Sequence, residues 1–128
     1  MVLPRFVEAA QAGEPLRVFG DGQQSRCFCD VDDTVEALLR LAKCSSAPGG
    51  VFNIGSTEEV TILSLAKRVI ELTGSTSEIE LVPYDEAYDA GFEDMQRRKP
   101  VVDKLEQFTG FRPSTPLDDI IRSAAGLA

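Results

Sequence analysis

The sequence contains no histidine. Mechanisms that use an imidazole as a general base, as the activator of a nucleophile or as a zinc ligand are therefore excluded for these residues. Basic residues are also scarce: 13 Lys and Arg stand against 21 Asp and Glu, which gives a formal net charge of -8. A surface of that charge repels the phosphate backbone of a nucleic acid, so we expect no nucleic-acid partner.

Cysteines are few, and long apolar runs are missing. Cys27 and Cys29 form a C-x-C pair and Cys44 stands alone, which matches neither a zinc ribbon nor a C-x-x-C redox pair. We expect reduced, mostly buried thiols. The apolar start of the chain is broken by Pro4 and Arg5 and lacks the basic lead of a signal peptide. These features predict a cytoplasmic protein that does not bind membranes.

The length and composition are those of one compact globular domain over residues 1–128, with 43% hydrophobic and 27% charged residues. The apolar spacing and the turn residues predict four or five helices, near residues 3–10, 35–42, 62–70, 103–108 and 117–124. Short apolar runs between turn residues predict strands at residues 16–19, 26–31, 51–55 and 79–82. This alternation predicts an α/β fold.

Residues at the ends of these elements indicate where the helices begin and end. Gly13 and Gly74 are expected to end the first and third helices, and Thr61 to cap the third. The second helix is expected to be capped by Asp32 or Asp33. The acidic cluster around these two residues lacks the glycine and the distal glutamate of an EF-hand, so we expect helix capping and no metal site. The irregular stretch 83–100 is long enough to be a functional loop.

Several sequence blocks carry a family resemblance. They are VLPRF at residues 2–6, VFGDGQQSRCF at 18–28, VDD at 31–33, FNIG at 52–55 and GFRP at 110–113. In this order and spacing they resemble the C-terminal part of the extended short-chain dehydrogenase/reductases that act on nucleotide sugars, the NAD-dependent epimerase, dehydratase and decarboxylase group. The stretches YDEAY at 84–88 and GFEDM at 91–95 resemble a subgroup near the UDP-sugar epimerases and decarboxylases.

The resemblance implies that the two halves of a Rossmann-type enzyme have different roles. In such enzymes the N-terminal half carries the glycine-rich NAD site and the catalytic Tyr-x-x-x-Lys pair, and the C-terminal half holds the nucleotide end of the substrate. This sequence has no G-x-x-G-x-x-G turn, and Tyr84 and Tyr88 are followed four places later by Tyr88 and Phe92. The resemblance therefore implies a small substrate-binding C-terminal portion without the dinucleotide-binding half. No catalytic, cofactor-binding or metal-binding residue is expected here, and NAD is expected only for the full-length enzyme.

Four residues match the family's substrate-binding positions. Arg26 lies at the position where the family has a guanidinium that contacts the substrate diphosphate. The alternative interpretation of Arg26 is a surface arginine paired with a carboxylate. Phe19 lies at the position where an aromatic residue of the family packs on the pyrimidine base. The alternative interpretation of Phe19 is a core phenylalanine at the end of a strand. Arg97 and Arg98 precede a segment in which Val101 replaces the family's acidic residue, so either arginine could align with the ligand-binding one.

The implied partners are a nucleotide sugar, bound weakly by this portion alone, and the missing N-terminal cofactor domain. Without that domain the apolar stripe at residues 35–42 and the strand at 51–55 would be uncovered, which predicts a dimer or a swapped homo-oligomer. The alternative interpretation is a standalone, non-catalytic interaction or assembly module derived from the family. A third interpretation is a free-standing enzyme that uses only carboxylates. No feature of the sequence distinguishes a catalytic pair of carboxylates from carboxylates that cap helices.

Overall fold

The computed structural model describes residues 1–84 and 95–127, and these form two compact units. The first unit comprises Met1–Arg26, Val60–Arg98 and Ile121–Ala128, and the second comprises Cys27–Glu59 and Lys99–Ile120. Five helices and four strands are interspersed along the described residues, and one of the strands, Glu59–Thr61, lies where the sequence predicts none. The α/β class is therefore confirmed. The single domain expected for residues 1–128 stays a prediction.

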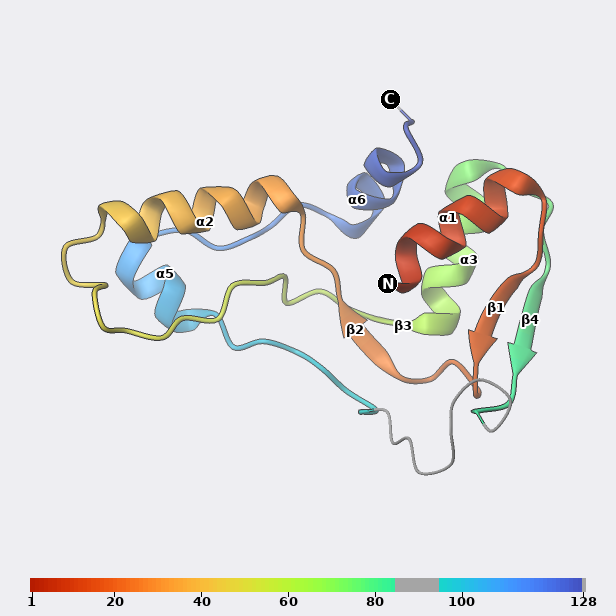
Figure 1. Ribbon diagram of the computed structural model, residues 1–128, viewed down its shortest axis with the longest axis horizontal. Coiled ribbons are helices and arrows are strands. Elements are labelled where there is room, and N and C mark those ends of the chain that lie inside the picture. The colour runs from red at the N-terminus through yellow and green to blue at the C-terminus, as the bar shows by residue number, and fades with distance from the viewer. Residues whose placement is uncertain (85–94, 128) are drawn as a thin grey trace. The chain divides into compact units, whose positions relative to one another are not determined.

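The first unit is built on a pair of parallel strands. Strand β1 (Leu16–Phe19) pairs with β4 (Ile79–Val82), with Leu16 opposite Ile79 and Phe19 opposite Val82. Helices α1 (Val2–Ala12) and α3 (Ile62–Thr73) pack on one another and on β1, as Figure 1 shows. Buried aliphatic and aromatic side chains fill the space between them: Leu3, Phe6, Val7, Leu16, Val18, Leu65, Val69 and Val82.

The ends of α1 and α3 follow the local signals in the sequence. Both helices end at a glycine in the left-handed conformation, Gly13 with a φ of 71° and Gly74 with a φ of 64°. The Thr61 side chain accepts a hydrogen bond of 3.1 Å from the Ser64 N–H and so caps α3. Ser75, just past α3, donates its hydroxyl proton to the Ala10 carbonyl at 2.7 Å, which fixes the two helix ends to one another.

The second unit contains α2 (Val31–Lys43) and α5 (Asp103–Thr109), which pack together. Each of the remaining elements has residues in both units. Strands β2 (Ser25–Cys27) and β3 (Glu59–Thr61) form the second two-stranded sheet and both cross the boundary between the units, as does α6 (Leu117–Ala124).

The prediction of a strand at residues 51–55 is wrong. These residues form no ladder, and Val51 is 83% exposed. Side chains take the place of a partner strand: Lys104 Nζ donates to the Val51 carbonyl at 2.9 Å, and Asn53 Nδ2 donates to the Val101 carbonyl at 3.3 Å. Lys104 also lies over the Phe52 ring, with its Nζ 4.6 Å from the ring centroid.

The start of α2 also differs from the prediction. The extended segment expected to reach Val31 ends as strand β2 at Cys27, and Val31 is already helical. The cap is Asp30, whose Oδ1 accepts from the Asp32 N–H at 2.8 Å, so the prediction of Asp32 or Asp33 is wrong. Asp33 Oδ2 instead accepts from two backbone N–H groups ahead of α6, at 3.0 and 2.9 Å.

Helix α2 presents an apolar stripe to solvent. Val31, Val35, Leu38 and Leu39 are between 47% and 71% exposed, and Ala37 is the buried residue of the helix. A stripe with this spacing normally packs on another element. The uncovered surface that the sequence predicts for residues 35–42 is therefore present in this chain.

Candidate functional site

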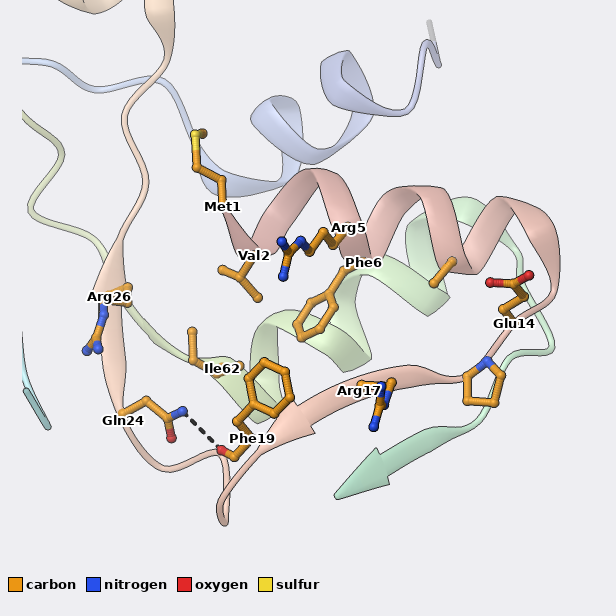
Figure 2. Close-up of a pocket in the computed structure, with 12 residues that line it drawn as sticks. Met1, Val2, Arg5, Phe6, Glu14, Arg17, Phe19, Gln24, Arg26 and Ile62 are labelled. Carbon is orange, nitrogen blue, oxygen red and sulfur yellow. Dashed lines mark hydrogen bonds between the residues drawn. The ribbon is translucent and has the colours of Figure 1, made fainter. Parts of the chain in front are cut away.

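A cavity of about 520 Å³ opens in the first unit. Residues from α1, β1, the turn after β1, β2 and the start of α3 line it: Met1, Val2, Arg5, Phe6, Ala9, Glu14, Pro15, Arg17, Phe19, Gln24, Arg26 and Ile62. Figure 2 shows the rings of Phe6 and Phe19 facing the same space, with Ile62 beside Phe19. The cavity therefore combines an apolar middle with polar side chains around it.

The charge of the lining is opposite to that of the chain. Three arginines, Arg5, Arg17 and Arg26, line the cavity against a single carboxylate, Glu14, whereas the whole chain carries a net charge of -8. Arg17 pairs with Glu80 on the neighbouring strand at 3.5 Å, but both side chains are exposed, and such a pair is worth little. A cationic, partly apolar cavity in an acidic protein favours an anionic ligand with a flat apolar part.

Phe19 lies in this cavity and is not a core residue. Along β1 the side chains alternate, with Leu16 and Val18 fully buried and Arg17 exposed. Because successive strand residues point to opposite faces, Phe19 shares the outer face with Arg17 and is half-buried there. The alternative of an ordinary core phenylalanine does not agree with this position.

Arg26 lies at the edge of the cavity on strand β2. Its Nη1 donates to the carbonyls of Ser25 and Met95, each at 2.7 Å. The bond to Met95 holds the guanidinium against the segment that contains Arg97 and Arg98. Arg26 lines the cavity, whereas Arg97 and Arg98 do not, and the substrate-binding role of all three stays a prediction.

A short parallel bridge fixes that segment to β2. The Ser25 N–H donates to the Gln96 carbonyl at 2.8 Å, and the Arg98 N–H donates to the Ser25 carbonyl at 3.4 Å, so Ser25 pairs with Arg97. Paired residues share a face, and the next residue on each strand points to the other face. Arg98 therefore shares a face with Arg26, and Arg97 shares one with Ser25.

Sequence reasoning missed Arg5, Arg17 and Gln24. Gln24 is 6% exposed, and its Nε2 donates to the Phe19 carbonyl at 3.2 Å, the bond drawn in Figure 2. The alternation along β1 could have placed Arg17 on the face of Phe19. Arg5 and Gln24 lie in the sequence blocks at 2–6 and 18–28, but no local signal assigns them to a cavity, because α1 and the turn after β1 meet only in the folded chain.

Carboxylates of the acidic cluster around Asp32 and Asp33 have structural partners. Asp30 caps α2, Asp33 accepts two backbone N–H groups, and Glu36 pairs with Arg40 one helical turn away. Among residues 1–84 and 95–127, no group of three or more carboxylate or cysteine side chains is placed to hold a metal ion. Within the same residues no helix is long and apolar enough to cross a membrane.

The described residues do not fit a dinucleotide site. Such a site needs a glycine-rich turn between a strand and the N-terminus of a helix. The left-handed glycines of the described residues lie elsewhere: Gly13, Gly74 and Gly110 end helices, Gly126 follows α6, Gly20 and Gly22 lie between two strands, and Gly49 lies in the loop after α2. No step of NAD chemistry is therefore assigned to these residues.

Comparisons with known proteins agree with this fold. The NAD dependent epimerase/dehydratase family model matches residues 1–55. The chain is 43% identical over 113 residues to a UDP-N-acetyl-alpha-D-glucosaminuronate decarboxylase of Bacillus cytotoxicus, covering 88% of this chain and 35% of the relative. It is 39% identical over 116 residues to UDP-glucuronic acid decarboxylase 4 of Arabidopsis thaliana, covering 91% and 24%.

A solved structure gives the same result. The UDP-glucose 4-epimerase of Thermotoga maritima with UDP-glucose superposes with a TM-score of 0.85 at 29% identity, over 98% of this chain and 38% of the epimerase. The α/β arrangement is thus that of part of an extended short-chain dehydrogenase/reductase of the Rossmann type. The chain belongs to the NAD-dependent epimerase/dehydratase family, and it spans about a third or less of the length of the two curated relatives.

Proposed function

We propose that this chain is the C-terminal, substrate-binding portion of an NAD-dependent enzyme that acts on UDP-sugars. In the complete protein the cofactor and the groups that react with the sugar belong to residues outside this sequence. The portion described here holds the nucleotide and has no catalytic activity alone. The observation that carries the proposal is the cationic cavity that joins the Phe19 ring to Arg26 in an acidic chain.

The chemistry of the cavity fits a nucleoside diphosphate. A pyrimidine base is flat and largely apolar on its faces, so the Phe19 ring offers it a stacking surface beside Phe6 and Ile62. A guanidinium suits the diphosphate, because its planar fork of donors matches phosphate oxygens. The two carbonyls that fix Arg26 prepare its orientation before the ligand arrives.

Between the two neighbouring arginines, we assign the second phosphate contact to Arg98. Arg98 shares a face of the bridge with Arg26, whereas Arg97 points with Ser25 to the other face. Two guanidiniums on one face can bind the two phosphates together. Arg97 is then a solvated surface residue, and its replacement has little effect on the ligand.

The names of the relatives favour a uronic acid as the sugar. Both curated relatives are decarboxylases of UDP-linked uronic acids. The superposed structure is a UDP-glucose epimerase, so the nucleotide is common to all three, and the reaction differs. We accordingly assign the UDP group to the cavity and decarboxylation, ahead of epimerisation, to the complete protein.

Calorimetric titration with UDP tests the binding claim. Arg26→Ala should weaken binding about tenfold or more, because it removes charge-assisted hydrogen bonds to phosphate. Arg98→Ala should weaken binding by a similar factor and Arg97→Ala by less than about twofold. Lys67→Ala, an exposed α3 residue outside the cavity, controls for the loss of one positive charge. Unchanged affinity in Arg26→Ala, or no binding by the unaltered chain, overturns the proposal.

The exposed stripe on α2 favours a second candidate, a non-catalytic assembly module. An exposed apolar stripe favours association with another apolar surface, and the same stripe on a second copy of the chain would provide that surface. The mass of the gene product in its source cells, measured by blot, distinguishes the two. A product more than twice the size of this chain supports the enzyme portion, and a product of its size supports the module.

A further inference from the structure

The peptide that joins Phe19 to Gly20 is held from two sides. Its carbonyl accepts a hydrogen bond from Gln24 Nε2 at 3.2 Å, and its N–H, that of Gly20, donates to the Val82 carbonyl at 2.8 Å. One bond comes from the turn ahead of β2 and the other from β4. Together they fix the plane of this peptide and hence the direction in which the Phe19 side chain leaves the backbone.

A ring covers the same peptide from a third direction. Gly20 has a φ of 69°, and a Cβ built on it would overlap Cε2 of Tyr84 and lie 2.8 Å from its Cδ2. The Tyr84 ring therefore lies directly against the Gly20 backbone, in space that another residue would need for its side chain. Glycine is required here both for the left-handed backbone and for this contact.

Gln24 is a buried residue whose side chain holds the Phe19–Gly20 peptide. It is 6% exposed, although glutamine is a residue usually found at the surface. Its own carbonyl accepts the Ile62 N–H at 3.0 Å, so its backbone is fixed to the start of α3. Its neighbour Gln23 is exposed, and the hydrogen bond to the Asp21 side chain uses only the Gln23 backbone.

We propose that Gln24 and Tyr84 are positioning residues that hold the Phe19–Gly20 peptide so that the Phe19 ring is ready to receive the base. The role of Phe19 rests on the proposed function, whereas the geometry of the peptide does not. Neither residue needs to touch the ligand. They act by removing alternative orientations of Phe19, which lowers the ordering cost of binding.

Binding measurements test this role against a merely structural one. Gln24→Met keeps the side-chain volume but removes the donor, and should weaken UDP binding about fivefold to tenfold, the effect of one buried hydrogen bond. Tyr84→Ala should weaken it similarly, whereas Tyr84→Phe keeps the ring and should bind like the unaltered chain. Gln23→Ala is the matched control and should also be unchanged. Binding by Gln24→Met that equals that of Gln23→Ala overturns the proposal.

A double-mutant cycle shows whether Gln24 acts through Phe19. In the Phe19→Ala background, Gln24→Met should cause no further loss of affinity, since the ring that it positions is gone. A general structural defect would weaken binding by the same factor in both backgrounds. Additive losses therefore overturn the assignment of Gln24 as a positioning residue for Phe19.

A measurement without ligand separates this inference from the proposed function. Hydrogen exchange of the Gly20 amide should be at least about tenfold faster in Gln24→Met than in the unaltered chain, because the peptide loses one of its two hydrogen bonds. In Gln23→Ala it should stay as slow as in the unaltered chain. Failure of the unaltered chain to bind UDP overturns only the proposed function. Unchanged Gly20 exchange in Gln24→Met overturns the positioning role.

Discussion

Replacement of Gly22 by alanine tests how the turn between β1 and β2 is built. Gly22 has a φ of 71°, and a Cβ built on it would lie 2.7 Å from Val18 Cγ1 and 2.9 Å from Leu63 Cβ. Val18 is fully buried, and the Leu63 N–H donates to the Gly22 carbonyl at 3.0 Å. Neither neighbour can withdraw without losing packing or that hydrogen bond, so alanine meets both backbone strain and a clash.

Gly13 supplies a matched control, because it has the same φ of 71° and no atom within 4 Å of its built Cβ. A non-glycine residue in the left-handed region costs about 1–2 kcal/mol, which is the effect expected for Gly13→Ala. Overpacking adds about 1–3 kcal/mol at Gly22. Gly22→Ala should therefore lower the free energy of unfolding by about 2–5 kcal/mol, roughly 1–3 kcal/mol more than Gly13→Ala.

Urea unfolding followed by circular dichroism measures both variants against the unaltered chain. The midpoint should fall more for Gly22→Ala than for Gly13→Ala, at an unchanged denaturant slope. Equal losses in the two variants would show that the contacts of Gly22 with Val18 and Leu63 are not as tight as described. The reasoning about this turn would then be refuted.

Three further outcomes are expected. Asp30→Ala should lower the free energy of unfolding by about 1 kcal/mol, more than Asp32→Ala in the same urea experiment, because Asp30 caps α2. The Ser46 hydroxyl lowers the pKa of Cys44, so alkylation of Cys44, followed by mass spectrometry, should reach its half-maximal rate at a lower pH than in Ser46→Ala; equal profiles would contradict this. Leu39→Glu should convert a self-associated chain to monomer in sedimentation, and an unaltered chain that is already monomeric at micromolar concentration would refute the predicted oligomer.

Elements with strong local signals could be predicted from the sequence. The first and third helices carry apolar residues at helical spacing and end at Gly13 and Gly74, and Thr61 caps the third, all as expected. The signals are local because caps and left-handed glycines act within one helical turn. The cap of α2 was predicted two or three residues late, since several aspartates in a row offer equivalent candidates and only Asp30 has the extended backbone of a cap.

Features that depend on distant contacts could not be predicted. The apolar run at residues 51–55 resembles a strand, but a strand needs a partner, and here Lys104 and Asn53 provide the hydrogen bonds instead. The same limit applies to the site. Phe19 and Arg26 were found because each matches a substrate-binding position of the family, whereas nothing in the blocks that contain Gln24 and Arg5 marks these two residues, which meet the cavity only through tertiary packing. Residues 85–94, which carry most of the subgroup motif, lie outside the described residues.

The most direct test of the central claim is a map of backbone amide shifts in labelled protein during titration with UDP. The account predicts saturable shifts at Phe19, Gly20, Arg26 and Arg98, and their loss in Arg26→Ala. Residues of the second unit such as Lys104 should not shift. Absent shifts at the cavity, or shifts that persist unchanged in Arg26→Ala, would contradict the assignment of this cavity to the nucleotide.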